Sequence, residues 1–484
     1  MTGVTPTWFD RLDERMGDRL EAVLRHHHHR RLSKLGWGAG LQPEEHGWWS
    51  PRAELRGGNA VDVLIDGADA FEAMQEAILG ARDSVHIAGW HASPEFKLTR
   101  DPGSPTLRDL LAEVAERVPV RLLLWAGPPL PAYEPTRKTV RAVREEFMRD
   151  SRVDCALDNR ERTLHCHHEK IVVVDGTVAF VGGIDFTALE GDRHDHPQHV
   201  PRGPLGWHDA AVRLRGPAVA DVARHLVQRW NEVTGDRLPD PPTPEVAGDI
   251  DLQVLRTIPE KTYAFAPRGA FSILDAYLRA LRSAERFIYL ENQFLWSPEV
   301  VDVLAHRLRH PPCKDFRILL VLPTKPSNGR DTTRGQLGRL LDADAGAGRL
   351  LATTISANGG DESSAVYVHA KIGIIDDRWL TIGSANLNEH SLFNDTEMNV
   401  LTCDPRLARQ TRLRLWAEHT ERPLDAIAGD PATVIDDVWS PIAHEQSRLD
   451  DAKKERTHRL TLLPRVSRRV DRLEGPMRGL LVDG

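Results

Sequence analysis

The sequence predicts an α/β fold of two similar lobes, each a mixed β-sheet flanked by helices, with an active site at the interface between the lobes. Three observations lead to this prediction. Short β-branched runs alternate with segments of helical length, as in a sheet covered by helices. A motif of histidine, lysine and aspartate occurs twice. The elements around it recur in the same order in both halves, which indicates an internal duplication.

The repeated motif occupies residues 165–185, HCHHEKIVVVDGTVAFVGGID, and residues 369–386, HAKIGIIDDRWLTIGSAN. Each copy reads His-x-Lys, four apolar residues, Asp, six residues and a turn of small residues. Positions 369 and 168 differ by 201, and the segments IYLENQF and IAGWHASPEF, which begin at 288 and 87, are offset by the same number. One His-x-Lys pair arises easily by chance, but two copies with the same downstream spacing do not.

The spacing directs both chemical groups of each copy at one spot. The runs after the lysines, IVVV and IGII, are rich in β-branched residues and predict strands. Side chains two residues apart on a strand share a face, so His168 points the same way as Lys170, and His369 the same way as Lys371. Two copies facing each other would surround one anion with two imidazoles and two ammonium groups. Such a site suits a phosphodiester.

The remaining elements follow the same alternation in both halves. In the first half we expect strands at 61–66, 85–90, 120–125 and 153–157 and helices at 68–81, 107–117 and 139–148. In the second half we expect helices at 270–283, 300–308 and 406–419 and strands at 287–291 and 317–322. The proline-rich stretch 236–249 reads as the linker between the lobes.

These elements divide the chain into four segments. Residues 1–57 form an N-terminal accessory helix and a tryptophan-containing loop, 58–240 the first lobe, 250–425 the second lobe, and 426–484 a basic, amphipathic tail. Trp37, Trp48 and Trp49 either cap the first lobe or meet a lipid interface. The four-histidine run 26–29 reads as a solvated helix end, with metal binding as the weaker alternative. The tail either binds anionic lipid or packs on its own domain.

Composition narrows the class of protein. The chain has 484 residues and a net charge of −8, which argues against a general nucleic-acid binder. It contains no run of about 18 apolar residues and no basic start followed by an apolar stretch, so we expect neither a membrane span nor a signal peptide. The expected location is cytoplasmic, with peripheral contact at the inner face of a membrane.

The cysteines do not suggest a disulfide framework. Four are scattered along the chain without a CxxC pair. Cys166 lies beside His165, His167 and His168, which raises the question of a metal cluster. Neighbouring side chains on a strand point to opposite faces, so we expect these four residues to diverge, and we expect neither a metal nor a cofactor.

Both copies of the motif resemble the HxKxxxxD signature of the phospholipase D superfamily. The segments IAGWHASPEF and IYLENQF, and the element WHD leading into AAVRLRGPAV and QRWN, are similar to the eukaryotic-type phospholipases D. The resemblance covers roughly residues 58–420. The two turns differ, because Gly183 and Asp185 stand at the positions of Ser384 and Asn386. A Gly-Gly turn is common in the first half of phospholipid-specific members, as the resemblance implies.

The resemblance implies a two-step mechanism through a phosphohistidine. It makes His168 the nucleophile and His369 the general acid and base, although the near symmetry of the copies leaves the order open. Lys170 and Lys371 would neutralise the non-bridging oxygens of the phosphate. The signature aspartates complete the set of motif residues, and we interpret them as holding turns; they are Asp175 and Asp376.

Several further residues are candidates for supporting this site. An acidic residue opens a strand-like run after each copy, and we expect Asp209 to lie behind His168 and Glu397 behind His369, where each would fix a histidine tautomer. We expect four further residues to line or brace the site: Ser384, Asn386, Asn292 and Gln293. Gly183 is expected to leave room on the other side of the site. We expect loops 189–206 and 325–338 to form substrate-selecting walls.

The leading functional interpretation is a phosphodiesterase of the phospholipase D type, which hydrolyses glycerophospholipids or transfers the phosphatidyl group to an alcohol. A phosphatidyltransferase similar to cardiolipin synthase would use the same chemistry with another acceptor, but many bacterial members carry N-terminal membrane helices that this sequence lacks. A nuclease and a catalytically inactive lipid-binding scaffold are the remaining alternatives. Because the motif is duplicated within one chain, a monomer suffices for a complete site.

Overall fold

A computed structural model of the chain describes residues 8–42, 47–129, 135–161, 165–187, 206–324, 330–359 and 362–463. The sheet of the first half consists of β1 (Leu55–Ile65), β2 (Val85–Gly89), β3 (Val120–Trp125), β4 (Asp154–Asp158), β5 (Lys170–Val174), β6 (Val178–Gly182) and β8 (Ala210–Arg215). Its strand order is β4-β3-β2-β5-β6-β8-β1, in which β2, β3 and β4 are parallel and the other neighbours antiparallel.

The sheet of the second half repeats this order. It consists of β9 (Ile250–Ile258), β11 (Phe287–Asn292), β12 (Arg317–Val321), β13 (Leu350–Gly359), β15 (Lys371–Ile375), β16 (Trp379–Gly383) and β17 (Glu397–Thr402). The order is β13-β12-β11-β15-β16-β17-β9, with β11, β12 and β13 parallel. Strand β1 also pairs with β9 and so joins the two sheets. The mixed α/β architecture predicted from the sequence is confirmed.

Short strands complete the sheets. Strand β10 (Ala270–Phe271) pairs with β9, and β18 (Leu460–Leu462) pairs with β13. Strand β14 (Glu362–Val368) pairs with β13 and, in parallel, with β7 (Gly206–His208) of the first half. The pairing of β14 with β7 joins the two halves, and β14 ends at the residue that precedes His369 in the sequence.

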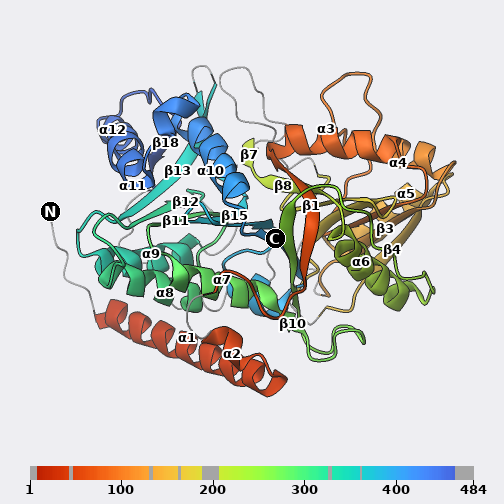
Figure 1. Cartoon of the computed structure of the whole chain (residues 1–484), viewed down its shortest axis with the longest axis horizontal. Helices are drawn as coiled ribbons and strands as arrows, with labels where there is room; N and C mark the ends of the chain where they lie inside the picture. Colours follow the sequence, from red (N-terminus) through yellow and green to blue (C-terminus); the bar gives the residue numbers. More distant parts are fainter. Residues whose placement is uncertain are drawn as a thin grey trace.

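Helices cover both sheets. The first half carries α3 (Asp66–Leu79), α4 (Leu107–Ala115), α5 (Arg137–Met148) and α6 (Val219–Thr234), and the second half α7 (Ser272–Ser283), α8 (Pro298–Arg309), α9 (Arg330–Asp344) and α10 (Pro405–Thr420). Figure 1 shows α3 above and α6 below the first-half strands, and α10 above and α7 to α9 below the second-half strands. The largest apolar cluster contains Trp230 of α6 and Trp416 of α10, so the two halves share a core.

Local signals in the sequence account for many boundaries. The hydroxyls of Thr106 and Thr136 accept hydrogen bonds from backbone N–H groups in the first turns of α4 and α5. Asp404 caps α10 in the same way, followed by Pro405 at a position where its missing N–H costs nothing. Strand β3 has the bounds expected from its apolar run, because it is buried on both faces.

The expected wall 325–338 is largely helical from Arg330 onward. Its glycines and polar residues favour a loop, but the side chains of Leu337, Leu340 and Ala343 pack into the apolar cluster of the second half. This burial outweighs the weak helix propensity of the segment. Most of the other expected wall, 189–206, lies outside the described residues.

The N-terminal segment packs on the second half, not the first. Helix α1 (Trp8–Leu35) lies beneath α7 to α9 in Figure 1, and Arg31 of α1 forms an ion pair of 2.6 Å with Glu260. It is followed by α2 (Gly38–Leu41). Trp37, Trp48 and Trp49 pack against the apolar cluster of the second half. The prediction that they cap the first lobe is therefore wrong, since nearness in sequence does not determine which lobe an accessory segment covers.

The four-histidine run lies within α1 and is not a solvated helix end. The ring of His28 is buried and stacks on Phe393 with 4.6 Å between centroids. Burial, helped by the nearby Arg31, lowers the pKa of His28 to about 4. The Nε2 atom of His29 lies 3.1 Å from a carboxylate oxygen of Glu299. Only His26 and His27 of the run are exposed.

The segment after α10 is folded as far as residue 463. Helices α11 (Pro431–Val434) and α12 (Ser440–Asp451) lead to β18, and Trp439 between the helices is fully buried in the shared core. This part of the expected tail therefore belongs to the second half. The arginine-rich stretch 465–478 lies outside the described residues. Among the described residues, every helix is too short or too polar to cross a lipid bilayer.

Candidate active site

The two motif copies begin equivalent strands. Lys170 is the first residue of β5, and Lys371 is the first residue of β15. His168 and His369 stand two residues earlier and are only 5% and 6% exposed. Both strands lie in the middle of their sheets, so the four side chains are fixed by well-packed backbone.

Backbone hydrogen bonds hold each motif histidine against the other half. The N–H of His168 donates to the carbonyl of Thr396 over 3.0 Å, and the N–H of His369 donates to the carbonyl of His208 over 2.8 Å. Thr396 and His208 each precede a conspicuous acid, namely Glu397 and Asp209. The two halves are therefore clasped at the points where these acids enter the site.

In this docked arrangement, each motif histidine contacts the carboxylate of the opposite half, not that of its own half. The Nδ1 atom of His168 lies 3.0 Å from Oε1 of Glu397, and Nδ1 of His369 lies 2.6 Å from Oδ2 of Asp209. The prediction that each acid serves the histidine of its own half is wrong. The reason is that each acid follows the segment that docks on the opposite half. These Nδ1 contacts orient both imidazoles, as a carboxylate does for a catalytic histidine.

Glu397 is held from two further directions. The hydroxyl of Ser384 donates to its Oε2, and the hydroxyl of Ser391 donates to its Oε1 over 2.5 Å. Ser391 lies in the π-helical turn η1 (His390–Asn394). Ser391 could not be selected from the sequence, because a π-turn that brings it back to Glu397 has no clear sequence pattern.

Gly183 leaves room for the carboxylate that serves the other half. A Cβ atom at this position would lie 2.3 Å from Oδ1 of Asp209, far inside contact distance. At the equivalent place in the second half, the Ser384 hydroxyl contacts Glu397 instead. The difference between the Gly-Gly and Gly-Ser turns thus matches the difference between the two acids they accommodate.

The two lysines have different partners. The Nζ atom of Lys170 lies 3.0 Å from Oδ2 of Asp185 and donates to the carbonyl of His168 over 2.7 Å. Burial opposes its charge, but Asp185 and Glu397 outweigh burial and raise the pKa of Lys170. Lys371 donates to the amide oxygen of Gln293 over 3.2 Å and to the carbonyl of His369.

Of the two residues expected at the end of β11, only Gln293 contacts the charged groups. Its side-chain oxygen also accepts from Nδ2 of Asn386 over 3.3 Å, and its Nε2 donates to the hydroxyl of Tyr367 over 2.8 Å. Asn292 instead accepts the N–H groups of Phe294 and Leu387, at 3.1 and 3.0 Å. It holds the backbone around the site.

The signature aspartates lie at the opposite ends of β5 and β15 from the histidines. The carboxylate of Asp175 accepts three backbone N–H groups from residues 82–84, and that of Asp376 accepts three from residues 285–287. Both residues have a left-handed backbone, with φ of 55° and 56°. They anchor the loops that enter β2 and β11 and do not reach the imidazoles.

The ionisation of the His369–Asp209 pair is set by burial. Burial, together with Lys371 and Lys170, holds the pKa of His369 well below its ordinary value. Burial raises the pKa of Asp209 to about 7, even though Lys371 opposes this. The free protein therefore favours a neutral His369 whose Nδ1–H points at Asp209.

His208, the buried residue before Asp209, is itself held by two carboxylates. His208 lies between two carboxylates, with Nδ1 at 2.8 Å from Asp66 and Nε2 at 2.6 Å from Glu291. Burial opposes its charge, but the two acids raise the pKa of His208 well above its ordinary value. Asp66 and Glu291 were not among the residues expected at the site. Their position at strand ends, next to β1 and within β11, is the signal that could have found them.

The side chains of the four residues considered for a metal cluster have different partners, although residues 165–168 precede β5 and do not form a strand. The side chain of Cys166 packs against Trp125, and Nε2 of His167 lies 3.1 Å from Asp158. His168 faces Glu397. His165 points elsewhere, toward the second half.

Comparison with known proteins identifies the family. A family model described as "Phospholipase D" matches residues 77–202, and a model described as "Cardiolipin synthase, PLD-like domain" matches residues 277–417. Each match contains one copy of the motif. The chain belongs to the phospholipase D superfamily.

Curated relatives place it near the eukaryotic-type branch of that superfamily. It is 26% identical to "Phospholipase D A" of Dictyostelium discoideum over 76% of this chain and 36% of the relative. It is 26% identical to "Phospholipase D1" of Schizosaccharomyces pombe over 80% and 38%, and 26% identical to "Phospholipase D2" of Bos taurus over 78% and 53%. The chain thus spans about a third to a half of the length of these relatives.

A solved structure has the same fold. The crystal structure of phosphatidylserine synthase from Haemophilus influenzae Rd KW20 superposes with a TM-score of 0.51 at 12% identity. The superposition covers 81% of this chain and 93% of the other. At this identity, the likeness supports the fold alone.

Proposed function

We propose that this protein is a phospholipase D-type phosphodiesterase. It hydrolyses a glycerophospholipid to phosphatidic acid and a free head group, or it transfers the phosphatidyl group to another alcohol. The observation that carries the proposal is the pair of imidazoles, each oriented by a carboxylate of the opposite half, beside two buried lysines. Besides burial, Lys371, Lys170 and His168 lower the pKa of His369, so the four groups lie near one another. Two imidazoles and two ammonium groups suit an anionic phosphodiester.

In the first step, Nε2 of His168 attacks phosphorus, and the bond from phosphorus to the head-group oxygen breaks. His369 gives the Nε2 proton to that oxygen, so the head group leaves as a neutral alcohol. Lys170 and Lys371 neutralise the non-bridging oxygens, whose charge grows in the transition state. Glu397 stabilises the positive charge that forms on His168.

In the second step, the phosphohistidine is resolved by water or by an alcohol. His369, now neutral, takes the proton of the incoming O–H group as its oxygen bonds to phosphorus. The N–P bond to His168 breaks, and both histidines return to their starting states. Two in-line displacements give net retention of configuration at phosphorus.

Substrate binding favours protonation of His369 by solvent, which the residue needs in order to act as an acid. In the free protein, Lys371 and Lys170 are among the groups that lower the pKa of His369. An anionic phosphodiester held between these lysines offsets their charge, and the pKa of His369 then rises. The site therefore protonates its acid when the substrate is present.

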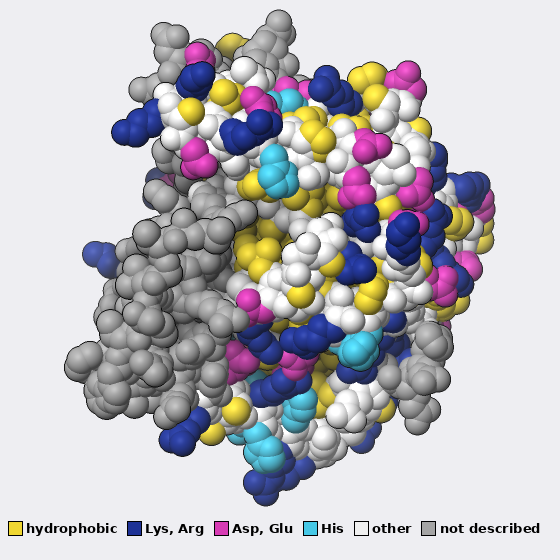
Figure 2. All heavy atoms as spheres, turned by 90° about the vertical axis from the view of Figure 1, so that its left-hand side faces the viewer, with side chains coloured by type: hydrophobic (Ala, Val, Ile, Leu, Met, Phe, Trp, Pro, Cys, Tyr) yellow, Lys and Arg dark blue, Asp and Glu magenta, His cyan; other side chains and the backbone are white. Residues whose placement is uncertain are grey.

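The names of the relatives, all phospholipases D, support a phospholipid as the substrate class. A phosphatidyltransferase similar to cardiolipin synthase shares every chemical step and differs in the acceptor. A nuclease is disfavoured by the net charge of −8 and by the mixture of acidic and basic side chains on the described part of the face in Figure 2. One chain supplies all four reacting groups, and we expect peripheral contact with a membrane surface.

The test is an incubation of the full chain with mixed phospholipid vesicles and ethanol, with products separated by mass. We expect phosphatidic acid and phosphatidylethanol, and we expect neither from His168→Ala or His369→Ala. Cardiolipin formation from phosphatidylglycerol without ethanol would favour the transferase alternative. Cleavage of single-stranded DNA without any lipid product would overturn the phospholipid assignment and leave the site assignment intact.

A further inference from the structure

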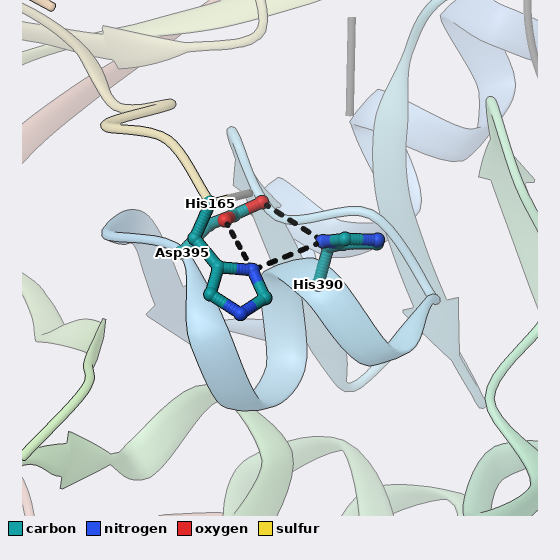
Figure 3. A group of neighbouring side chains, drawn as sticks. All are labelled: His165, His390 and Asp395. Carbon is teal, nitrogen blue, oxygen red and sulfur yellow. Dashed lines mark hydrogen bonds and ion pairs between the residues drawn. The ribbon is translucent and has the colours of Figure 1, made fainter. Parts of the chain in front are cut away.

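A second group of ligand-type side chains lies beside the active site. Figure 3 shows His165 of the first half facing His390 and Asp395 of the second half. The two Nδ1 atoms lie 3.4 Å apart. The carboxylate oxygens of Asp395 lie 3.6 Å from Nδ1 of His165 and 3.9 Å from Nδ1 of His390. His390 and Asp395 are buried, and the side chain of His165 is 15% exposed.

The backbone builds this group from both halves. The turn η1 closes with the N–H of Asp395 donating to the carbonyl of His390 over 2.8 Å, which brings the two side chains together. The N–H of Cys166 donates to Oδ1 of Asp395 over 2.9 Å, and the N–H of Thr396 donates to the carbonyl of Cys166 over 3.2 Å. Neither half forms the group alone.

The arrangement suits a metal ion better than a hydrogen-bonded group. Two imidazole Nδ1 atoms that face each other can share only one hydrogen, so a hydrogen bond between them leaves one of the two rings without a donor at this position. Ligand atoms about 2.0–2.2 Å from one zinc ion lie about 3.3–3.6 Å apart in a tetrahedral site. The observed separations of 3.4, 3.6 and 3.9 Å are close to this range.

Another cluster of ligand-type side chains is held together by hydrogen bonds. His208, Glu291 and His419 are also close enough to share an ion, but Glu291 already accepts from His208 over 2.6 Å and lies 3.0 Å from Nε2 of His419. In this cluster the facing atoms are already joined by short hydrogen bonds. The separations around His165 are longer, and they leave space for an ion.

We infer that His165, His390 and Asp395 bind a divalent transition metal of the zinc class, with water as the fourth ligand on the exposed side of His165. Two imidazoles and one carboxylate are a common ligand set for zinc. The ion takes no part in the proposed catalytic steps. This site is separate from the reacting groups, and metal binding there does not depend on the proposed function.

The expected role is to fasten the clasp between the halves. His165 stands three residues before His168, and Asp395 stands two residues before Glu397, which orients that histidine. Ser391, next to His390, donates a hydrogen bond to the same glutamate. A metal ion on these side chains would join the two segments that place Glu397 beside His168.

The first test measures zinc binding to the full chain after chelator treatment, by competition with a chromophoric chelator. Figure 2 shows histidines at the lower end of its face, where α1 lies, so the measurement uses a background with His26→Gln and His27→Gln. We expect one tight equivalent of Zn²⁺. His390→Gln and Asp395→Asn should each weaken it by more than about 100-fold, beyond the effect of losing an outer partner. The exposed His444→Gln should not change it.

A second test uses a variant of the partly exposed ligand, in case the variants of the buried ligands fold poorly. His165→Gln alters the partly exposed ligand, so this variant should keep its fold. Zn²⁺ should raise the thermal midpoint of the parent background and not that of His165→Gln. The inference is overturned if the parent background binds no Zn²⁺ tightly, or if all three ligand variants bind it as the parent does. Neither readout involves lipid turnover.

Discussion

The Asp209 carboxylate lies 2.6 Å from Nδ1 of His369, across the boundary between the two halves and 160 residues away in the chain. Glu397 makes the equivalent contact with Nδ1 of His168, 229 residues away in the chain. Each half therefore carries a histidine and a lysine but relies on the other half for the carboxylate that orients its imidazole. The two halves form one site only when they are docked.

The crossed pairs predict different effects for Asp209→Asn and Glu397→Gln. Both variants should lower kcat on phosphatidylcholine by about 10²–10⁴-fold, because a histidine loses the carboxylate that fixes its tautomer. An aryl phosphodiester has a good leaving group that needs no proton. Asp209→Asn, which acts through the acid His369, should therefore be much less damaging on the aryl substrate. Glu397→Gln should be equally damaging on both.

The order of the two histidines is checked separately. With the aryl substrate, His369→Ala should still form a covalent intermediate, and mass spectrometry should locate the phosphoryl group on His168. Its location on His369 in a His168→Ala variant would reverse the roles. If Asp209→Asn proved equally damaging on both substrates while His168 carried the phosphoryl group, Asp209 would not act through His369.

Gly183 predicts a steric effect on the same carboxylate. In Gly183→Ala, the new methyl group would meet Asp209 at 2.3 Å and force it away from His369. A displacement of about 1 Å at such a site costs about 10²-fold in rate. We expect at least that loss in kcat, with an unchanged far-ultraviolet circular dichroism spectrum.

Ser384→Ala is the matched control at the equivalent position. It removes one hydrogen bond to Glu397 and adds no atom, so we expect a loss of only about 10-fold. Equal losses of activity in the two variants would mean that the close approach of Gly183 to Asp209 is not the cause of the loss in Gly183→Ala.

The pH dependence of the rate should reflect the lowered pKa of His369. Burial, Lys371 and Lys170 hold this pKa well below the ordinary value, so the acid form is lost as pH rises through the lowered value. The alkaline limb of kcat/KM, which reports the free enzyme, should therefore lie below about pH 6.5. The alkaline limb of kcat should lie at higher pH, because the bound phosphodiester offsets both lysines.

Rates measured from pH 4 to pH 10 on vesicles of constant composition test this order of limbs. We expect a bell-shaped profile in each case. A kcat/KM that rises steadily to strongly basic pH would contradict a protonated histidine as the acid.

The fold was largely predictable because its signals are local. Strand β3 has the expected bounds, since a run of buried apolar residues between polar turns has one plausible conformation. The convergence of each histidine with its lysine follows from the two-residue period of a strand. By contrast, α9 forms where glycine and polar residues favour a loop, because Leu337 and Leu340 are buried against the core.

The crossing of the pairs could not be predicted from spacing. Asp209 stands 41 residues after His168, and Glu397 stands 28 residues after His369, so a pairing within each half is equally compatible with the sequence. The choice depends on how the halves dock, and that is decided by contacts such as the hydrogen bond from His168 to Thr396. The assignment of the tryptophans to the second half has the same origin.

A buried ion-pair network behind the first motif predicts a large effect on stability. Glu169, between His168 and Lys170, points away from the site, and its carboxylate lies 3.1 Å from Nη1 of Arg229. Arg229 also lies 2.8 Å from Asp158, and all three residues are almost fully buried. In Arg229→Met, two carboxylates lose their buried counter-ion. We expect the free energy of unfolding to fall by about 3–5 kcal/mol.

Urea unfolding at several pH values tests the prediction and its sign. Burial opposes the charge of Glu169, but Arg229 and His225 outweigh it and lower the pKa to about 2. The stabilisation from Glu169 is thus present above its unfolded pKa near 4.5 and is lost as pH falls toward 2. Arg229→Met should be most destabilising near pH 7 and less so near pH 3. The exposed Arg406→Met, which breaks an ion pair with Asp249, should leave the midpoint unchanged. An equal, small effect of both variants would mean that the buried arginine is dispensable and that Glu169 is held by His225 alone.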